Sequence, residues 1–111
     1  MKDMQRMMKE AQKMAAEMQK AQAEIAEVEV EGSAGGGVVR ATVTGDGQGV
    51  LGVVIDPEFF EGAPDADDIE ILGDSVTAAL NDALTKAREL QEQALGPLAG
   101  GMGGLGGLPG M

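Results

Sequence analysis

The sequence contains no cysteine and no histidine, and Phe59 and Phe60 are its only aromatic residues. Without cysteine the chain has no disulfide and no thiolate nucleophile, and an intracellular location is expected. Without histidine it lacks the commonest general base, and hydroxyl nucleophiles such as Ser33 and Ser75 have no evident base. We therefore expect a protein that is not an enzyme and that uses neither a cofactor nor a small-molecule substrate.

Large side chains and long apolar runs are also scarce. A chain of 111 residues whose apolar residues are mainly Ala, Val, Leu and Met forms one domain with a thin core, which favours help from a partner chain. No apolar run approaches the length needed to span a membrane, and the charged N-terminus has no apolar signal-peptide region. We expect no membrane association and a cytoplasmic protein.

Basic residues are few, with eight Lys and Arg against 19 Asp and Glu and a formal net charge of −11. That balance by itself argues against a nucleic-acid partner. The charge is uneven, however. Residues 1–20 hold five basic and three acidic side chains, whereas the rest of the chain holds three basic and sixteen acidic ones. The beginning of the chain is therefore its only cationic part.

Residues 1–28 have the pattern of one long amphipathic helix without Pro or Gly. A heptad register places an apolar seam at Met4, Met7, Ala11, Met14, Met18, Ala21, Ile25 and Val28. Beside this seam lie Asp3, Glu10, Glu17 and Glu24, and on the far side lies a basic ridge of Lys2, Arg6, Lys9, Lys13 and Lys20. We expect the seam to pack in the core or in a dimer interface. A solvated face is the ordinary interpretation of such a ridge.

The middle of the chain changes to a period of two, which is typical of strands. Residues 27–31 alternate Glu and Val, the glycine-rich residues 32–37 break the chain, and residues 38–44 alternate again. In this second strand Val39, Ala41 and Val43 should face away from Val38, Arg40 and Thr42. The sequence Gly45-Asp46-Gly47 predicts a tight turn before a third strand at residues 49–55. The short turns predict a three-stranded antiparallel meander.

A second amphipathic helix follows the loop at residues 56–66, with Asp65 or Asp67 as its N-cap. We expect it to end at Gly96-Pro97 and to be followed by a flexible Gly-rich tail over residues 96–111. The fold class is α+β: a long N-terminal helix, three strands and a C-terminal helix, with residues 1–95 as the domain.

Two other clusters favour structural interpretations. The glycines at 32–37 are not followed by Gly-Lys-Ser/Thr or by a helix, so they predict a hairpin turn and not a phosphate-binding loop. The carboxylates between residues 58 and 70 lack the spacing of a calcium loop, so we expect helix capping and no metal site.

Three stretches resemble the YbaB/EbfC family of bacterial nucleoid-associated proteins. They are residues 29–40 (EVEGSAGGGVVR), Ile55-Asp56-Pro57, and residues 78–87 with the run Ala78-Ala79-Leu80-Asn81-Asp82-Ala83. The Met- and Gln-rich first helix and the Gly-rich end are also similar to the family. Residues 72–75, Leu-Gly-Asp-Ser, depart from the family's Leu-Glu-Asp-Leu. The resemblance implies a homodimer with an α-β-β-β-α protomer that binds and bridges duplex DNA in the nucleoid with little sequence preference.

The basic ridge is the predicted DNA contact, with Lys86 and Arg88 on the second helix as secondary candidates. Because the rest of the chain is acidic, we expect weak, salt-sensitive and largely non-specific binding. The alternative is a protein-interaction module that uses the Met-rich seam and the acidic surface, with negligible DNA binding. For the Asn81-Asp82 pair we expect a structural role, with Asn81 tying the helix to a neighbouring strand or loop.

Overall fold

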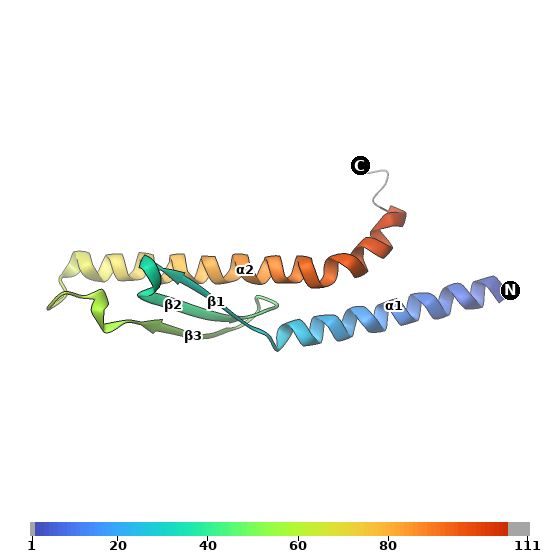
Figure 1. Cartoon of the computed structure of the whole chain (residues 1–111), viewed down its shortest axis with the longest axis horizontal. Coiled ribbons are helices and arrows are strands. Elements are labelled where there is room, and N and C mark those ends of the chain that lie inside the picture. The colour runs from blue at the N-terminus through green and yellow to red at the C-terminus, as the bar shows by residue number, and fades with distance from the viewer. Residues whose placement is uncertain (1, 107–111) are drawn as a thin grey trace.

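The computed structural model describes residues 2–106, with side chains described as far as residue 96, and it has the predicted order of elements. The elements are α1 (Lys2–Ala26), β1 (Glu29–Ala34), η1 (Gly35–Gly37), β2 (Val39–Thr44), β3 (Val50–Ile55), η2 (Pro57–Phe59) and α2 (Ala66–Gly106). Figure 1 shows α2 lying along one face of the sheet and α1 extending beyond the sheet's end. The molecule is elongated, with principal extents of 75 × 30 × 18 Å. The α+β class and the α-β-β-β-α order are confirmed, whereas the homodimer stays a prediction.

The sheet is the predicted antiparallel meander, with strand order β1-β2-β3. However, β1 continues through residues 32–34, where a chain break was predicted, and the turn is confined to Gly35–Gly37. The reason lies at Gly32, which is buried beneath α2. A Cβ atom there would lie 2.1 Å from the backbone nitrogen of Ala83. The absence of a side chain at Gly32 therefore allows α2 to approach β1 closely. Only the three glycines after Ala34 form the turn, with φ of 62°, 72° and 99°.

The core lies between β2 and α2. As the alternation predicted, Val39, Ala41 and Val43 are fully buried, and they belong to the same two clusters as the buried Ala79, Ala83 and Ala87 of α2. Burying each valine stabilises the fold by roughly 1.5–3 kcal/mol. Because the helix presents alanines here, it approaches the sheet closely, and the core is thin.

Strand β3 is left uncovered. The helix α2 packs mainly against β1 and β2, and all six residues of β3 are exposed. Val50 is 59% exposed and Leu51 and Val54 are each 53% exposed. An apolar strand at the edge of a sheet with so much of its surface in solvent is a ready pairing site for another chain.

Both helices differ from their predicted bounds. Helix α1 ends at Ala26, so Glu27 and Val28 form a turn before β1, because the strand ladder with β2 begins at Glu29. Helix α2 begins after Asp65, whose Oδ1 accepts a hydrogen bond from the backbone N–H of Asp68 (2.9 Å), while Asp68 Oδ2 accepts one from the N–H of Asp65 (3.0 Å). This reciprocal pair is a capping box, which confirms Asp65 as the N-cap.

The predicted helix end at Gly96-Pro97 is wrong, because α2 runs on to Gly106. A proline removes one backbone donor and bends a helix without forbidding its continuation, and Figure 1 shows the last part of α2 turning away from its first part. The predicted tail is therefore helical over residues 96–106, and residues 107–111 lie outside the described part. Neither helix in the described part is both long enough and apolar enough to cross a membrane.

Candidate nucleic-acid interface

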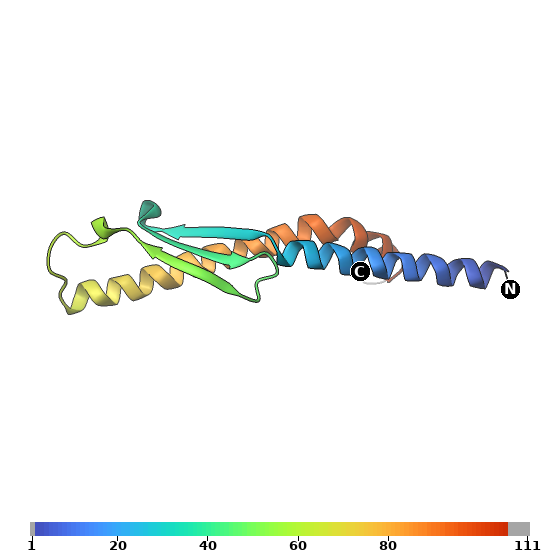
Figure 2. The ribbon, with the colours of Figure 1, turned by 90° about the horizontal axis from the view of Figure 1, so that it is seen from below.

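Helix α1 forms an arm that is attached to the body at one end. Ile25, near its C-terminal end, is 5% exposed and is the buried residue of this helix, whereas Met14, Met18 and Ala21 are half-buried. Farther out the seam is open: Ala11 is exposed, and Met4 and Met7 are 69% and 67% exposed. Figures 1 and 2 show the same arrangement from two directions, with the N-terminus farthest from the sheet. The seam therefore contributes to the core only near its C-terminal end.

The basic ridge lies on this arm. All five of its side chains are exposed: Lys2, Arg6, Lys9, Lys13 and Lys20. At about 100° per residue they fall within an arc of about 60°, and at 1.5 Å per residue they cover about 27 Å of helix. In the described part of the chain, none of them forms an ion pair with a carboxylate. The ridge is thus a narrow row of cations that is open to an anionic ligand.

The secondary candidates, Lys86 and Arg88, are on a different element and are less available. Lys86 Nζ lies 3.1 Å from Asp82 Oδ2, so an acidic neighbour already offsets its charge. Arg88 is exposed but is followed by Glu89 and lies one helical turn before Glu92. Both residues belong to α2, so the structure gives no single basic surface that joins them to the row on α1.

Asp82 ties α2 to the sheet. Its Oδ2 accepts a hydrogen bond of 2.9 Å from the backbone N–H of Ser33 in β1. This bond, together with the contact to Lys86, holds the pKa of the Asp82 carboxyl below its ordinary value of 3.8. The tie that was predicted for Asn81 is therefore made by its neighbour. Asn81 is exposed and makes no side-chain hydrogen bond within the described residues.

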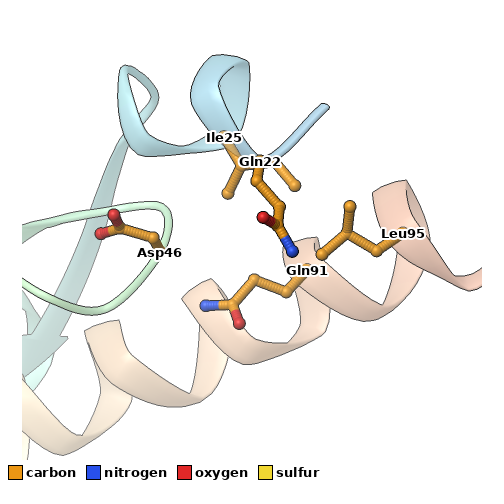
Figure 3. A pocket seen from close by; sticks show the side chains of 5 residues that line it. All are labelled: Gln22, Ile25, Asp46, Gln91 and Leu95. Atoms are coloured by element: carbon orange, nitrogen blue, oxygen red, sulfur yellow. The ribbon is translucent and has the colours of Figure 1, made fainter. Parts of the chain in front are cut away.

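The turn between β2 and β3 meets both helices. Asp46 Oδ1 accepts hydrogen bonds from the Thr44 hydroxyl (2.5 Å) and the Gln48 N–H (3.0 Å), and these bonds lower the pKa of Asp46. Beside the turn is a cavity of about 230 Å³, shown in Figure 3. It is lined by Gln22 and Ile25 of α1, Asp46 of the turn, and Gln91 and Leu95 of α2. Its mixed lining holds no group of three potential metal ligands, and neither does any other part of the described chain.

Sequence comparison identifies the family. A sequence profile of the YbaB/EbfC DNA-binding family matches residues 1–102. The chain belongs to the YbaB/EbfC family. It is 54% identical over 86 residues to a nucleoid-associated protein of Rhodococcus opacus, a match that covers 78% of this chain and 71% of the relative. It is also 48% identical over 109 residues to a nucleoid-associated protein of Saccharopolyspora erythraea, covering 98% of this chain and 90% of the relative.

A solved structure has the same fold. The crystal structure of the uncharacterized protein HP0035 from Helicobacter pylori superposes with a TM-score of 0.60 at 22% identity, covering 83% of this chain and 87% of that one. At this identity the similarity concerns the fold alone.

Two polar contacts of this YbaB/EbfC member were not predicted from its sequence. Gln91 Nε2 donates a hydrogen bond of 2.9 Å to the carbonyl oxygen of Gly45, 46 positions earlier in the chain. The Asp82 bond to Ser33 spans 49 positions. A structural role was expected for the Asn81-Asp82 pair, but no local pattern reveals the partner of Asp82 or of Gln91, since each partner is a backbone group brought in by the fold.

Proposed function

We propose that this protein is a nucleoid-associated protein of the bacterial cytoplasm that binds and bridges duplex DNA as a homodimer, with little sequence specificity. The observation that carries the proposal is the exposed basic ridge on an arm that projects from the body. The names of the relatives and of the matching family support DNA as the partner.

Local charge supports DNA binding in spite of the net charge of −11. Charges separated by more than about 8–10 Å are largely screened at physiological ionic strength. The ridge extends along an arm that leaves the sheet, so a duplex lying along it meets the row of five cations first. Lys and Arg contacts to phosphates read no bases, so binding through this row is non-specific. The sixteen acidic residues elsewhere in the chain repel the phosphates of DNA. This repulsion is strongest at low salt, where screening is less complete, and it offsets part of the attraction by the ridge.

A difference between the two edge strands of the sheet supports the homodimer: β1 is partly blocked and β3 is open. On β1 the N–H of Ser33 is already bonded to Asp82, and Glu29 and Glu31 add charge to that strand. On β3 the residues are all apolar or Gly, and all are exposed. Pairing with a second copy through β3 would cover this edge and hold two arms in one particle. Two ridges held apart by a common body are what bridging of two duplexes requires.

The decisive experiment is a mobility shift with duplex DNA at about 50 and about 200 mM salt, with the wild type and a ridge variant. The ridge variant carries Arg6→Gln, Lys9→Gln and Lys13→Gln, which preserve helix propensity and leave the seam unchanged. A matched control carries Arg40→Gln, Ala78→Glu and Gln93→Glu, all at exposed positions outside the candidate DNA contacts, and so has the same net charge. The ridge variant should bind less tightly, and its salt slope should become shallower by about one for each phosphate that it no longer neutralises.

The control variant should keep most of the affinity and the salt slope of the wild type. Equal binding by the wild type and the ridge variant would show that the ridge is only a solvated face. An equal fall in the affinity of both variants would show that total charge matters and the position of the charges does not. In both variants the oligomeric state should be unchanged in sedimentation equilibrium, since none of the six changed residues lies on β3 or in the seam.

A protein-interaction module is the second candidate function, and the exposure of Met4 and Met7 favours it. Methionine side chains adapt to many apolar partners. Binding through them would respond little to salt, whereas phosphate contacts weaken steeply as salt rises. The same titration therefore separates the two functions.

A further inference from the structure

Three elements of the fold meet at Gly45, in the turn after β2. The N–H of Gly45 donates a hydrogen bond of 2.8 Å to the carbonyl oxygen of Val28, just after α1. Its own carbonyl oxygen accepts the 2.9 Å bond from Gln91 Nε2 on α2. One buried peptide segment is thus held from both sides, and through it the end of α1 is connected to α2.

The last turn of α1 lies directly on this segment. A Cβ atom at position 45 would be 2.3 Å from the carbonyl oxygen of Ile25 and 3.1 Å from the side chains of Ile25 and Leu90. Ile25 is also the buried residue of α1. The C-terminal end of α1 is therefore seated on the turn through Ile25, at a position where only glycine leaves enough room.

Beyond Ile25 the packing of the arm is incomplete, since Met14, Met18 and Ala21 are only half-buried and the residues farther out are exposed. The cavity of about 230 Å³ next to Gln91 is lined by residues of both helices, and its lining includes the polar side chains of Gln22 and Asp46. Figure 3 shows Gln22 and Ile25 reaching into this space from α1 and Gln91 and Leu95 reaching into it from α2. Since the space beside the turn is not filled by side chains, the polar link from Gln91 to Gly45 adds a restraint at the base of the arm.

A small rotation at this joint has a large effect on the ridge. A helix of 25 residues is about 37 Å long, so a change of about 10° at its base moves its far end by about 6 Å. That distance is comparable to the spacing of a few phosphates along a duplex.

We propose that Gln91 is a positioning residue for the arm. By holding Gly45, it fixes the angle at which α1 leaves the body and with it the direction of the basic ridge. What the ridge binds rests on the proposed function, whereas the effect of Gln91 on the angle of the arm does not.

Distance measurement by pulsed electron spin resonance tests the joint itself. Because the chain has no native cysteine, Gln12→Cys on α1 and Glu31→Cys on β1 provide two label sites, both at exposed positions. Dilution with excess unlabelled protein limits the signal to distances within one chain. The background with native Gln91 should give a narrow distribution of distances between the two labels.

Gln91→Leu removes the donor, and we expect the distance distribution to become at least twice as wide. Gln91→Glu keeps the side-chain length but offers only acceptors at neutral pH, so it should widen the distribution similarly. Gln91→Lys restores a donor and should return a narrow distribution. Gln93→Leu is the matched control, because Gln93 is exposed on the same helix and makes no side-chain hydrogen bond in the described part. A narrow distribution in Gln91→Leu and Gln91→Glu, even with a lowered Tm, would overturn the proposal.

DNA binding tests the consequence for the ridge. Gln91→Leu should lower DNA affinity several-fold with an unchanged salt slope, because all ridge charges remain, whereas the ridge variant lowers both. An arm that is loosened with unchanged DNA affinity would overturn the positioning role toward DNA. If the wild type binds no DNA, the proposed function fails, and the spin-label distances still decide whether Gln91 sets the angle of the arm.

Discussion

The backbone N–H of Ser33 donates a hydrogen bond of 2.9 Å to the Oδ2 of Asp82, which joins the free edge of β1 to the middle of α2. The same carboxylate lies 3.1 Å from Lys86 Nζ. One side chain therefore occupies an edge donor of the sheet and lowers the local positive charge on α2. The consequence is an asymmetric sheet, in which β1 is blocked and β3 remains open.

The Asp82 bond should make stability depend on pH in the acidic range. Since the pKa of folded Asp82 lies below its ordinary value of 3.8, the unfolded chain takes up the proton more readily than the folded one. The stabilisation is complete above the ordinary value and is lost as the pH falls through the lower, folded value. Asp82→Asn can still accept from Ser33 but cannot ionise. Its Tm should be lower than that of the wild type at neutral pH, and the difference should shrink below pH 3.8.

Thermal unfolding followed by circular dichroism at several pH values measures this difference. Asp74→Asn is the control, because Asp74 is an exposed carboxylate on the same helix without a hydrogen bond in the described residues. If the difference in Tm between the wild type and Asp82→Asn stayed constant down to pH 2, the role assigned to the Asp82 charge would be refuted.

Gly32→Ala should be severely destabilising, because the new Cβ atom would lie 2.1 Å from the nitrogen of Ala83 and 2.5 Å from the carbonyl oxygen of Ala79. Both are backbone atoms of α2, so the helix must move away from the sheet, at a cost of about 3 kcal/mol or more. Gly52→Ala is the control, since nothing lies within 4 Å of a Cβ there, and it should change stability by less than about 1 kcal/mol. Urea unfolding of both variants gives the comparison, and similar midpoints for the two would contradict the close approach.

The open edge of β3 predicts how the protein associates. Leu51→Lys together with Val53→Lys places charge on a strand whose residues are already exposed, so the protomer should stay folded while pairing through β3 is abolished. We expect a dimer for the wild type and a monomer for this variant in sedimentation equilibrium at micromolar concentration. Ala78→Lys, at an exposed position on α2, is the control and should remain a dimer. A wild-type monomer, or a dimeric β3 variant, would rule out association through this edge.

Local periodicity was sufficient to predict most of the elements. The alternation in β2 identified Val39, Ala41 and Val43 as the buried face, because side chains on a strand alternate between its two sides wherever the strand lies. In the same way, the spacing of the five basic residues placed them on one side of a helix, since this depends only on the helical repeat. Asp65 was one of two N-cap candidates because capping is a contact between residues three apart.

Contacts between distant parts of the chain were decided only by the tertiary structure. Gly32 was interpreted as part of a turn, but it is a strand residue, because α2 crosses it too closely for a side chain. The sequence pattern predicted that α2 ends at Gly96-Pro97, because proline lowers the stability of a helix locally. The helix nevertheless continues to Gly106. The bonds of Asp82 to Ser33 and of Gln91 to Gly45 have backbone partners, which no residue pattern reveals. The sequence by itself thus determined which residues share one face of each helix and strand, because this depends only on backbone geometry. The blocked edge at β1, the open edge at β3 and the contact of α1 with Gly45 depend on how the elements pack.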